Sequence, residues 1–289
     1  MNVHSGERRV MLTARLLGRL WVVVDGQVVD TASSRRTRNV LAYLLTHRET
    51  PVPRDVLMDV FWGNADPEAA RNSVHVALSG VRRALRATGP EPLLERRHDT
   101  YRFADHLDVW VDVEAFEQAS RQGRRAEEAG DAAAALEAYE RAGQLYDGDF
   151  LADDPYAPWA GEIRETLRAQ ANDVACRMVA LYGRLGDDSS AVLVGRRVLA
   201  GDPCNEPVHR QLMASYARAG QRHLGLLQYQ RCREALWTTF RIQPAVETTV
   251  LYDSLRGRLP QAAPGNARDR GHLPRPALHA EPGRTRVRV

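Results

Sequence analysis

The chain has 289 residues, of which 44% are hydrophobic and 27% charged, an ordinary composition for a globular protein large enough for two domains. All 40 basic residues are arginine, which excludes enzymes that depend on a lysine, such as P-loop hydrolases, protein kinases and pyridoxal enzymes. The net charge of +3 is unevenly spread: residues 1–105 carry 16 Arg against 12 Asp and Glu, residues 106–258 carry 18 against 23, and residues 259–289 carry 6 against 2. A basic first part and an acidic second part suggest contact with nucleic acid at one end and with proteins at the other.

The sequence also lacks the motifs of common catalytic and metal sites. There is no His-Glu-x-x-His, Gly-x-Ser-x-Gly or glycine-rich dinucleotide motif. The three cysteines form no Cys-x-x-Cys pair and are expected to be buried, reduced thiols. The aspartates between Asp147 and Asp154 lack the spacing of a calcium-binding loop and are expected to form a solvated turn. We therefore expect no enzyme activity, no catalytic residue, no cofactor and no metal ion.

The apolar segments give no sign of a membrane protein. The longest apolar run near the start, residues 20–24, is too short to span a bilayer or to form the core of a signal peptide. Because a disulfide framework is also absent, we expect a cytoplasmic location.

In chain order, the first hundred residues predict a sheet, three helices and a hairpin. Residues 11–29 are predicted to form short strands, because Val and Trp favour strands and Asp25-Gly26 is a hairpin-turn signal. Ser33 or Ser34 is expected to cap the first helix, Pro53 opens the second, and the third runs from Asp66-Pro67 to about Arg86. The expected core positions of the second helix are Val56, Leu57, Val60 and Phe61.

After a Gly89-Pro90 break, residues 93–94 and 101–103 predict two strands around a polar turn. A hairpin that follows three helices in this way is typical of the wing of a winged helix, a variant of the helix-turn-helix.

The third helix has the residues of a DNA reader. Drawn at about 3.6 residues per turn, its apolar side chains fall on one side: Val74, Ala77, Leu78, Val81 and Leu85. The opposite side has no carboxylate and carries Asn72, His75, Ser79, Arg82, Arg83 and Arg86. Arg can pair with guanine and Asn with adenine, while His and Ser can contact bases or phosphates. In the wing, we expect Arg96, Arg97 and Thr100 to reach the flanking backbone or the minor groove.

From residue 113 to about residue 256 the pattern is helical and repeats. Tyr182 and Gly186 recur 34 residues later as Tyr216 and Gly220. This is the period of tetratricopeptide repeats, in which a turn glycine separates two packed helices. Further matching positions are Leu193 with Leu227, and an earlier copy at Gly130, Ala135, Tyr139 and Ala142.

These segments carry a resemblance to a known family. LLGRLWVVVDGQVVD and NVLAYLLTHRETPVPRDVLMDVFWGNADPEAARNSVHVALSGVRRAL resemble the DNA-binding half of the Streptomyces antibiotic regulatory proteins, which is similar to the OmpR/PhoB-type winged helices of response regulators. WVDVEAFEQA, LYDGDFL and DPCNEPVHRQLMASYARAGQ resemble the bacterial transcriptional activator domain of that family. The resemblance covers about residues 10–256. It departs from related winged helices at Ser79-Gly80, where these often carry basic residues.

The resemblance implies a mainly α protein with a small β part, in four segments. These are a flexible N-terminus (1–9), a winged-helix DNA-binding domain (10–105), a helical activator domain of tetratricopeptide type (106–258) and a basic tail rich in Pro, Gly and Arg (259–289), which its composition predicts to be disordered. Carried over by position, the recognition helix is 68–86 and the wing is 95–103.

The resemblance also implies a function. Members of the family are pathway-specific activators of antibiotic biosynthesis genes, which bind direct repeats in duplex DNA as dimers and engage RNA polymerase or its sigma factor. Two alternatives stay open at this point. One is a metabolite-responsive regulator with a ligand in the groove of the helical domain, and the other is an interaction scaffold whose winged helix does not bind DNA.

Overall fold

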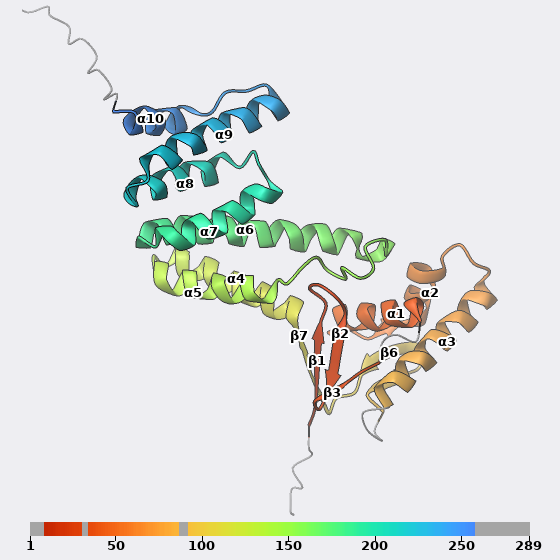
Figure 1. Ribbon diagram of the computed structural model, residues 1–289. Coiled ribbons are helices and arrows are strands. Elements are labelled where there is room, and N and C mark those ends of the chain that lie inside the picture. Colours follow the sequence, from red (N-terminus) through yellow and green to blue (C-terminus); the bar gives the residue numbers. More distant parts are fainter. Residues whose placement is uncertain (1–8, 31–33, 87–91, 258–289) are drawn as a thin grey trace, which may run out of the picture.

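The computed structural model describes residues 9–30, 34–86 and 92–257 (Figure 1). Within these ranges the structure is mainly helical, with two small sheets near the N-terminus. The predicted N-terminal segment before residue 9, the alternative cap Ser33, the Gly89-Pro90 break and the predicted tail 259–289 lie outside the described residues.

The first sheet has four strands in the order β3-β2-β1-β7. Its bounds are β1 Val10–Arg15, β2 Trp21–Val24, β3 Gln27–Val28 and β7 Leu107–Val111. The predicted turn at Asp25-Gly26 is confirmed, because both residues have positive φ (45° and 82°) and Val24 pairs with Gln27. Strand β7 was not predicted; it pairs in parallel with β1 and leads straight into the helical region.

Three helices follow, and their capping is largely as predicted. They are α1 Arg35–Thr46, α2 Arg54–Trp62 and α3 Pro67–Arg86. Ser34 caps α1, since its side chain accepts a hydrogen bond from the backbone N–H of Thr37 at 3.0 Å.

The prediction for α2 was partly wrong. Pro53 precedes the helix in an extended conformation, as part of the short strand β4 Val52–Pro53. Leu57 and Phe61 are buried as expected, but Val60 is half-buried and Val56 is exposed. The fully buried stripe of α2 is therefore narrower than the apolar pattern suggested, and Met58, Val60 and Trp62 pack against the core while partly exposed.

The predicted wing hairpin is confirmed. Strands β5 Leu94–Arg97 and β6 Thr100–Phe103 pair antiparallel around a turn in which His98 has a φ of 55°. The strand β4 adds to the other edge of β6, which gives the order β4-β6-β5.

The next six α-helices stack as antiparallel pairs, and the last one, α10, packs on α8 and α9 (Figure 1). They are α4 Asp112–Glu128, α5 Ala132–Leu145, α6 Gly161–Leu185, α7 Asp188–Gly201, α8 Glu206–Arg218, α9 Arg222–Phe240 and α10 Val246–Leu255, with a short 3₁₀ helix, η1 Pro158–Ala160, before α6.

The predicted repeat is visible in how these helices end. Tyr182 and Tyr216 are buried in the last turns of α6 and α8, and Gly186 and Gly220 follow them with φ values of 82° and 73°. A glycine accepts this left-handed conformation without the strain of a side chain, so it ends the first helix of each pair.

One continuous hydrophobic core joins the winged helix to the first helices of the second part. Its buried members run from Leu12 in β1 through Leu41 in α1 and Phe116 in α4 to Leu181 in α6. A second, smaller core lies between α6, α7 and α8. Since the first core crosses the predicted boundary at residues 105/106, the winged helix and the first helical pair pack as one body.

A buried carboxylate supports this connection. Asp112, the first residue of α4, is 2% exposed, and its two oxygens accept hydrogen bonds from the backbone N–H groups of Leu16 and Leu17 at 2.8–2.9 Å. Leu16 and Leu17 follow β1 directly, so the start of the helical part is fixed to the end of the first strand.

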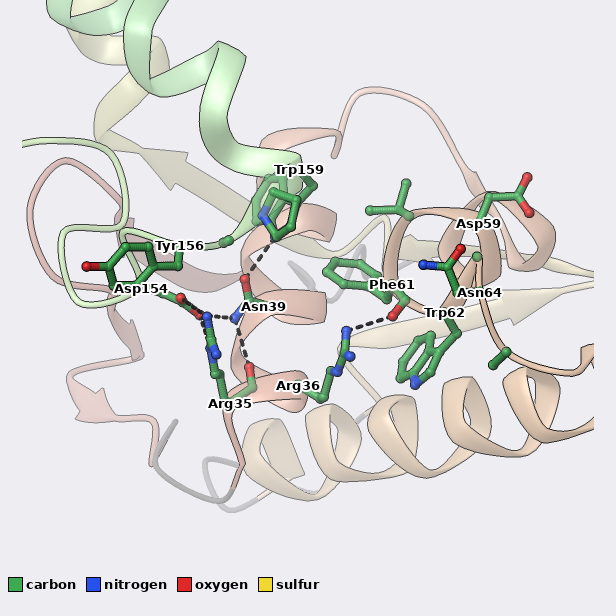
Figure 2. A pocket seen from close by; sticks show the side chains of 15 residues that line it. Arg35, Arg36, Asn39, Asp59, Phe61, Trp62, Asn64, Asp154, Tyr156 and Trp159 are labelled. Atoms are coloured by element: carbon green, nitrogen blue, oxygen red, sulfur yellow. Dashed lines mark hydrogen bonds and ion pairs between the residues drawn. The ribbon is translucent and has the colours of Figure 1, made fainter.

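The second connection between the winged helix and the helical part joins α1 to the segment that follows α5. We name it the interdomain clamp and define it by Arg35 and Asn39 of α1, Asp154 of the loop and Trp159 of η1 (Figure 2). The carboxylate of Asp154 accepts hydrogen bonds from Arg35 Nε (2.7 Å), Arg35 Nη2 (2.5 Å) and Asn39 Nδ2 (2.7 Å). The indole Nε1 of Trp159 donates to Asn39 Oδ1 at 2.8 Å. Every polar atom of the Asn39 amide that faces the loop is therefore paired.

Backbone contacts strengthen the same loop. Leu151 N donates to Leu16 O (2.8 Å), Ala152 N donates to Gly18 O (2.7 Å), and Gly18 N donates to Asp149 O (3.0 Å). The expectation that this acidic segment is a solvated turn was therefore wrong at Asp154, whereas Asp147 is exposed as expected. Asp154 is only 4% exposed, because it pairs with side chains of α1 that lie more than a hundred positions earlier in the sequence.

The clamp generates a stability prediction. Arg35 and Asn39 hold the pKa of the Asp154 carboxyl below its usual value of 3.8. A carboxyl with a lowered pKa stabilises the fold above its usual pKa, and this contribution disappears as the pH falls through the lowered value. We expect Asp154→Asn to lower Tm by a few degrees at pH 7, and we expect the difference from the wild type to shrink below about pH 4.

The matched control is Asp147→Asn, the same change at an exposed position of the same loop with no hydrogen bond to the side chain among the described residues. Thermal unfolding followed by circular dichroism measures both. Equal Tm values for the two variants at pH 7 would show that the clamp does not stabilise the fold.

A buried histidine gives a second pH dependence. His209 in α8 is 3% exposed, its Nε2 lies 3.0 Å from the carbonyl oxygen of Pro203, and its Nδ1 lies 2.7 Å from Nε2 of Gln228. This pattern fits a neutral ring that donates from Nε2 and accepts at Nδ1. Burial lowers the pKa of His209 below 6.5.

The unfolded chain binds this proton more readily than the folded one. The contribution of His209 to the free energy of unfolding is therefore fully present above about pH 6.5 and is lost as the pH falls toward the lowered pKa. We expect His209→Gln to flatten the decrease of Tm between pH 7.5 and pH 5. His223→Gln, which replaces an exposed histidine on α9, is the control and should keep the wild-type slope. A slope unchanged by His209→Gln would exclude this residue as the source.

Candidate nucleic-acid interface

The two faces of α3 differ as the sequence predicts. The apolar positions Val74, Ala77, Leu78, Val81 and Leu85 are all buried. They pack α3 against α1 and α2, on the side of the winged helix that faces the protein. The opposite side of α3 lies at the outer edge of the molecule, away from the stacked helices (Figure 1).

We call this side the reading face and define it by its exposed residues: Arg71, Asn72, His75, Val76, Ser79, Arg83 and Arg86. Five of them were predicted from the sequence, and two were missed. Arg71 lies just before the stretch that was predicted to read DNA, and Val76 is an apolar residue that was predicted for neither side of the helix. Val76 is 70% exposed and lies one turn after Asn72.

The charge of the reading face is not balanced within the described part of the chain. Arg71, Arg83 and Arg86 have no ion pair or hydrogen bond to a carboxylate there, although many arginines elsewhere do. Glu68 is the one acidic residue of α3, and it is exposed in the first turn, on the same side of the helix as Arg71 and Asn72. The face is therefore a concentration of positive charge and hydrogen-bond donors.

Gly80 explains why the predicted reader lacks a basic residue at this position. A Cβ atom there would lie 2.8 Å from Oγ1 of Thr37 in α1, which is closer than such atoms approach in proteins. The helices α1 and α3 thus cross at Gly80 at a distance that leaves no room for a side chain.

Arg82, also predicted to contact DNA, lies between α3 and the wing. It is half-buried, with its guanidinium 5.7 Å from the ring centroid of Tyr101 and its Nε 3.4 Å from the carbonyl oxygen of Leu94. These contacts fix the wing to α3 and leave only part of the guanidinium available to a ligand.

The predicted wing residues come together at the turn, where each has a partner within the wing. Arg96 donates to the carbonyl oxygen of His98 (2.9 Å) and to Asp99 (3.0 Å), and Arg97 donates to Glu95 (3.2 Å). The Thr100 hydroxyl donates to the carbonyl oxygen of Arg97 at 2.9 Å. The positive charge of the wing is thus partly compensated, whereas that of the reading face is not.

Other kinds of site are not seen in the described residues. No group of three or more His, Cys, Asp or Glu side chains there is arranged to hold a metal ion. None of the helices in these ranges combines the length and apolar character needed to cross a membrane.

Family models match both parts of the chain. The model of the bacterial transcriptional activator domain matches residues 111–256, which is the helical part from the end of β7 to the end of α10. The model described as "Transcriptional regulatory protein, C terminal" matches residues 26–103, which contain the three helices and the wing.

Individual relatives agree with these matches. The chain is 28% identical over 276 residues to the transcriptional regulatory protein EmbR of Mycobacterium tuberculosis, a match that covers 88% of this chain and 65% of EmbR. It is 26% identical over 267 residues to the regulatory protein DnrI of Streptomyces peucetius, covering 90% of this chain and 96% of DnrI. The match to the regulatory protein AfsR of Streptomyces coelicolor, also 26% identical, covers 76% of this chain and only 22% of AfsR.

The fold has a solved counterpart. The structure of Mycobacterium tuberculosis EmbR in complex with a low-affinity phosphopeptide superposes with a TM-score of 0.72 at 24% identity, over 88% of this chain and 67% of that one. The chain therefore has an OmpR-type winged helix followed by an activator domain, and its fold is that of the EmbR structure. The chain belongs to the family of transcriptional regulators with a bacterial transcriptional activator domain, the type of the Streptomyces antibiotic regulatory proteins, which are regulators and not enzymes.

Proposed function

We propose that the protein is a sequence-specific DNA-binding activator that places α3 in the major groove of duplex DNA. The observation that carries the proposal is the reading face, on which three exposed arginines lack a carboxylate partner in the described residues. A major groove admits one α-helix, and its phosphates supply the negative charge that this face lacks.

The residue types of the reading face fit base edges. Asn72 can pair with adenine through its amide, and Arg83 can donate two parallel hydrogen bonds to guanine. Val76 lies between them on the same face and suits contact with the methyl group of thymine. Arg96, Arg97 and Thr100 in the wing, with the exposed part of Arg82, are assigned to the flanking backbone or minor groove.

We further propose that two copies bind side by side on a direct repeat. A single small module buries only about 600–1,000 Å² of protein surface on DNA, and a second copy held by its neighbour adds affinity through effective concentration. The acidic helical part is then free to contact RNA polymerase or its sigma factor, in the cytoplasm. The target genes in this proposal are those of antibiotic or other secondary-metabolite biosynthesis, by analogy with the family.

The first test concerns the reading face. The probe is a duplex selected from a random pool by the full chain. We expect Arg83→Ala to weaken its binding by about 1–3 kcal/mol and to relax the preference at one base pair if Arg83 reads a base. Arg71→Ala is expected to lower affinity for all sequences and to reduce the slope of log affinity against log salt by about one, as a phosphate contact does.

Arg184→Ala, at an exposed arginine of α6 without a partner among the described residues, is the matched control, because it removes the same charge far from α3. Fluorescence anisotropy at several salt concentrations measures all three variants. If Arg71→Ala and Arg83→Ala bind like Arg184→Ala, the reading face does not contact DNA.

The second test concerns activation and the tandem arrangement. It uses transcription in vitro with the full chain and promoters that carry two selected sites as a direct repeat, as an inverted repeat, or as a single site. We expect strong activation only with the direct repeat, since that order alone presents both copies in the same orientation. Changing the promoter is cleaner than truncating the protein, because a chain that ends at residue 110 would lose Asp112. Repression from the direct repeat, or equal activation from the inverted one, would contradict the proposal.

A further inference from the structure

The helical part contains a groove that the proposed DNA-binding function does not use. It has a volume of about 780 Å³ and lies along α6, between α5 and α7. Each helix lines it with a stripe of one face, such as Val194, Arg197, Val198 and Gly201 on α7, and Ala171, Ala175 and Met178 on α6. Its floor is therefore mainly apolar, with Gln144 and Asn172 as further polar lining residues, and its size lies within the range of small-molecule sites.

Two glycines leave open space along the sides of the groove, and a hydrogen-bonded pair of polar side chains lies at each end. A Cβ atom at Gly143 would meet only Met178 Sδ, at 3.7 Å, and one at Gly201 would meet no atom within 4 Å. At one end Arg168 pairs with Asp149 at 2.5 Å, and at the other the Tyr182 hydroxyl donates to Glu140 at 2.6 Å. The two ends are 14 residues apart on α6, about 21 Å at the rise of a helix, which leaves room for an extended chain of medium length between them.

The charges that line the groove differ in whether they are neutralised. Arg168 is paired with Asp149 and with Glu165, and Glu140 accepts from Tyr182. Arg197 is exposed on α7 and has no hydrogen bond or ion pair with any described residue. A free guanidinium above an aliphatic floor matches a ligand with one anionic group and a long apolar body.

We propose that this groove binds an aliphatic carboxylate of medium chain length, with its carboxylate on Arg197 and its chain along Ala171, Ala175 and Met178. An acyl chain brings no hydrogen-bonding groups onto the apolar floor. An extended peptide would leave backbone N–H and C=O groups unpaired there, at a cost in free energy. The site would make the helical part a sensor of such acids.

The probe is 11-(dansylamino)undecanoic acid, whose fluorescence increases in an apolar site, with decanoate and decan-1-ol as competitors. The full chain is used without DNA, so the result is independent of the proposed DNA-binding function. We expect decanoate to displace the probe and decan-1-ol to do so less well. Arg197→Gln should lower the affinity for decanoate by about three- to tenfold and leave the affinity for decan-1-ol unchanged, because it removes one exposed charge-assisted contact.

Gly143→Leu should fill the groove and weaken the binding of the probe and of both competitors. The circular dichroism spectrum of this variant should stay that of the wild type. Arg184→Gln, which removes an exposed charge outside the groove, is the control and should change nothing. The proposal would be overturned if the probe did not bind, or if Arg197→Gln bound decanoate as well as the wild type does. It would also be overturned if an amphipathic helical peptide bound, with an affinity that Gly143→Leu reduces, while decanoate did not bind.

Discussion

The pairing of Asp154 with Arg35 and Asn39 connects parts of the chain that are separated by more than a hundred residues, and the position of α3 relative to the helical stack depends on it. Asn39 is hydrogen-bonded to Asp154 with one side of its amide and to Trp159 with the other. The ring of Trp159 in turn packs against Tyr43 and Phe61, at centroid distances of 5.2 and 6.1 Å. A polar network that is fully paired and lies beside an aromatic cluster restricts the two parts to one relative orientation.

This rigidity bears on how such a protein recognises DNA. A reader attached through a flexible linker accepts many spacings between two sites, because the linker absorbs the difference. Here β7 passes directly into α4, Asp112 fixes that junction to the end of β1, and the clamp fixes α1 to the loop before α6. In the proposed tandem complex, contacts between the helical parts of neighbouring copies would therefore constrain the distance between the two reading faces and favour a fixed repeat spacing.

The sequence was a good guide to features with local causes. The Ser34 cap, the Asp25-Gly26 turn, the apolar stripe of α3 and the glycines of the repeat all follow from residues within one or two turns of each other, and all are present. Features with distant causes were missed. Strand β7 forms because it pairs with the edge of β1. Asp154 is buried because it accepts hydrogen bonds from Arg35 and Asn39 of α1. Neither partner is visible in the local pattern. Val76 was predicted for neither side of α3, and the helical geometry places this apolar residue outside.

The distribution of carboxylates explains why the reading face is basic although the whole chain is nearly neutral. Asp112 and Asp154 are buried at the connection, Asp131 and Asp187 cap helices, and Asp99 and Glu95 pair with arginines of the wing. None of these acids is near enough to pair with Arg71, Arg83 or Arg86. Arg83 and Arg86 are three positions apart and repel each other in the free protein, whereas Arg71, about 18 Å farther along the helix, is largely screened from them by salt. A phosphate backbone removes the repulsion and adds attraction, so the same uneven placement of charge that slightly destabilises the free protein favours its complex with a polyanion.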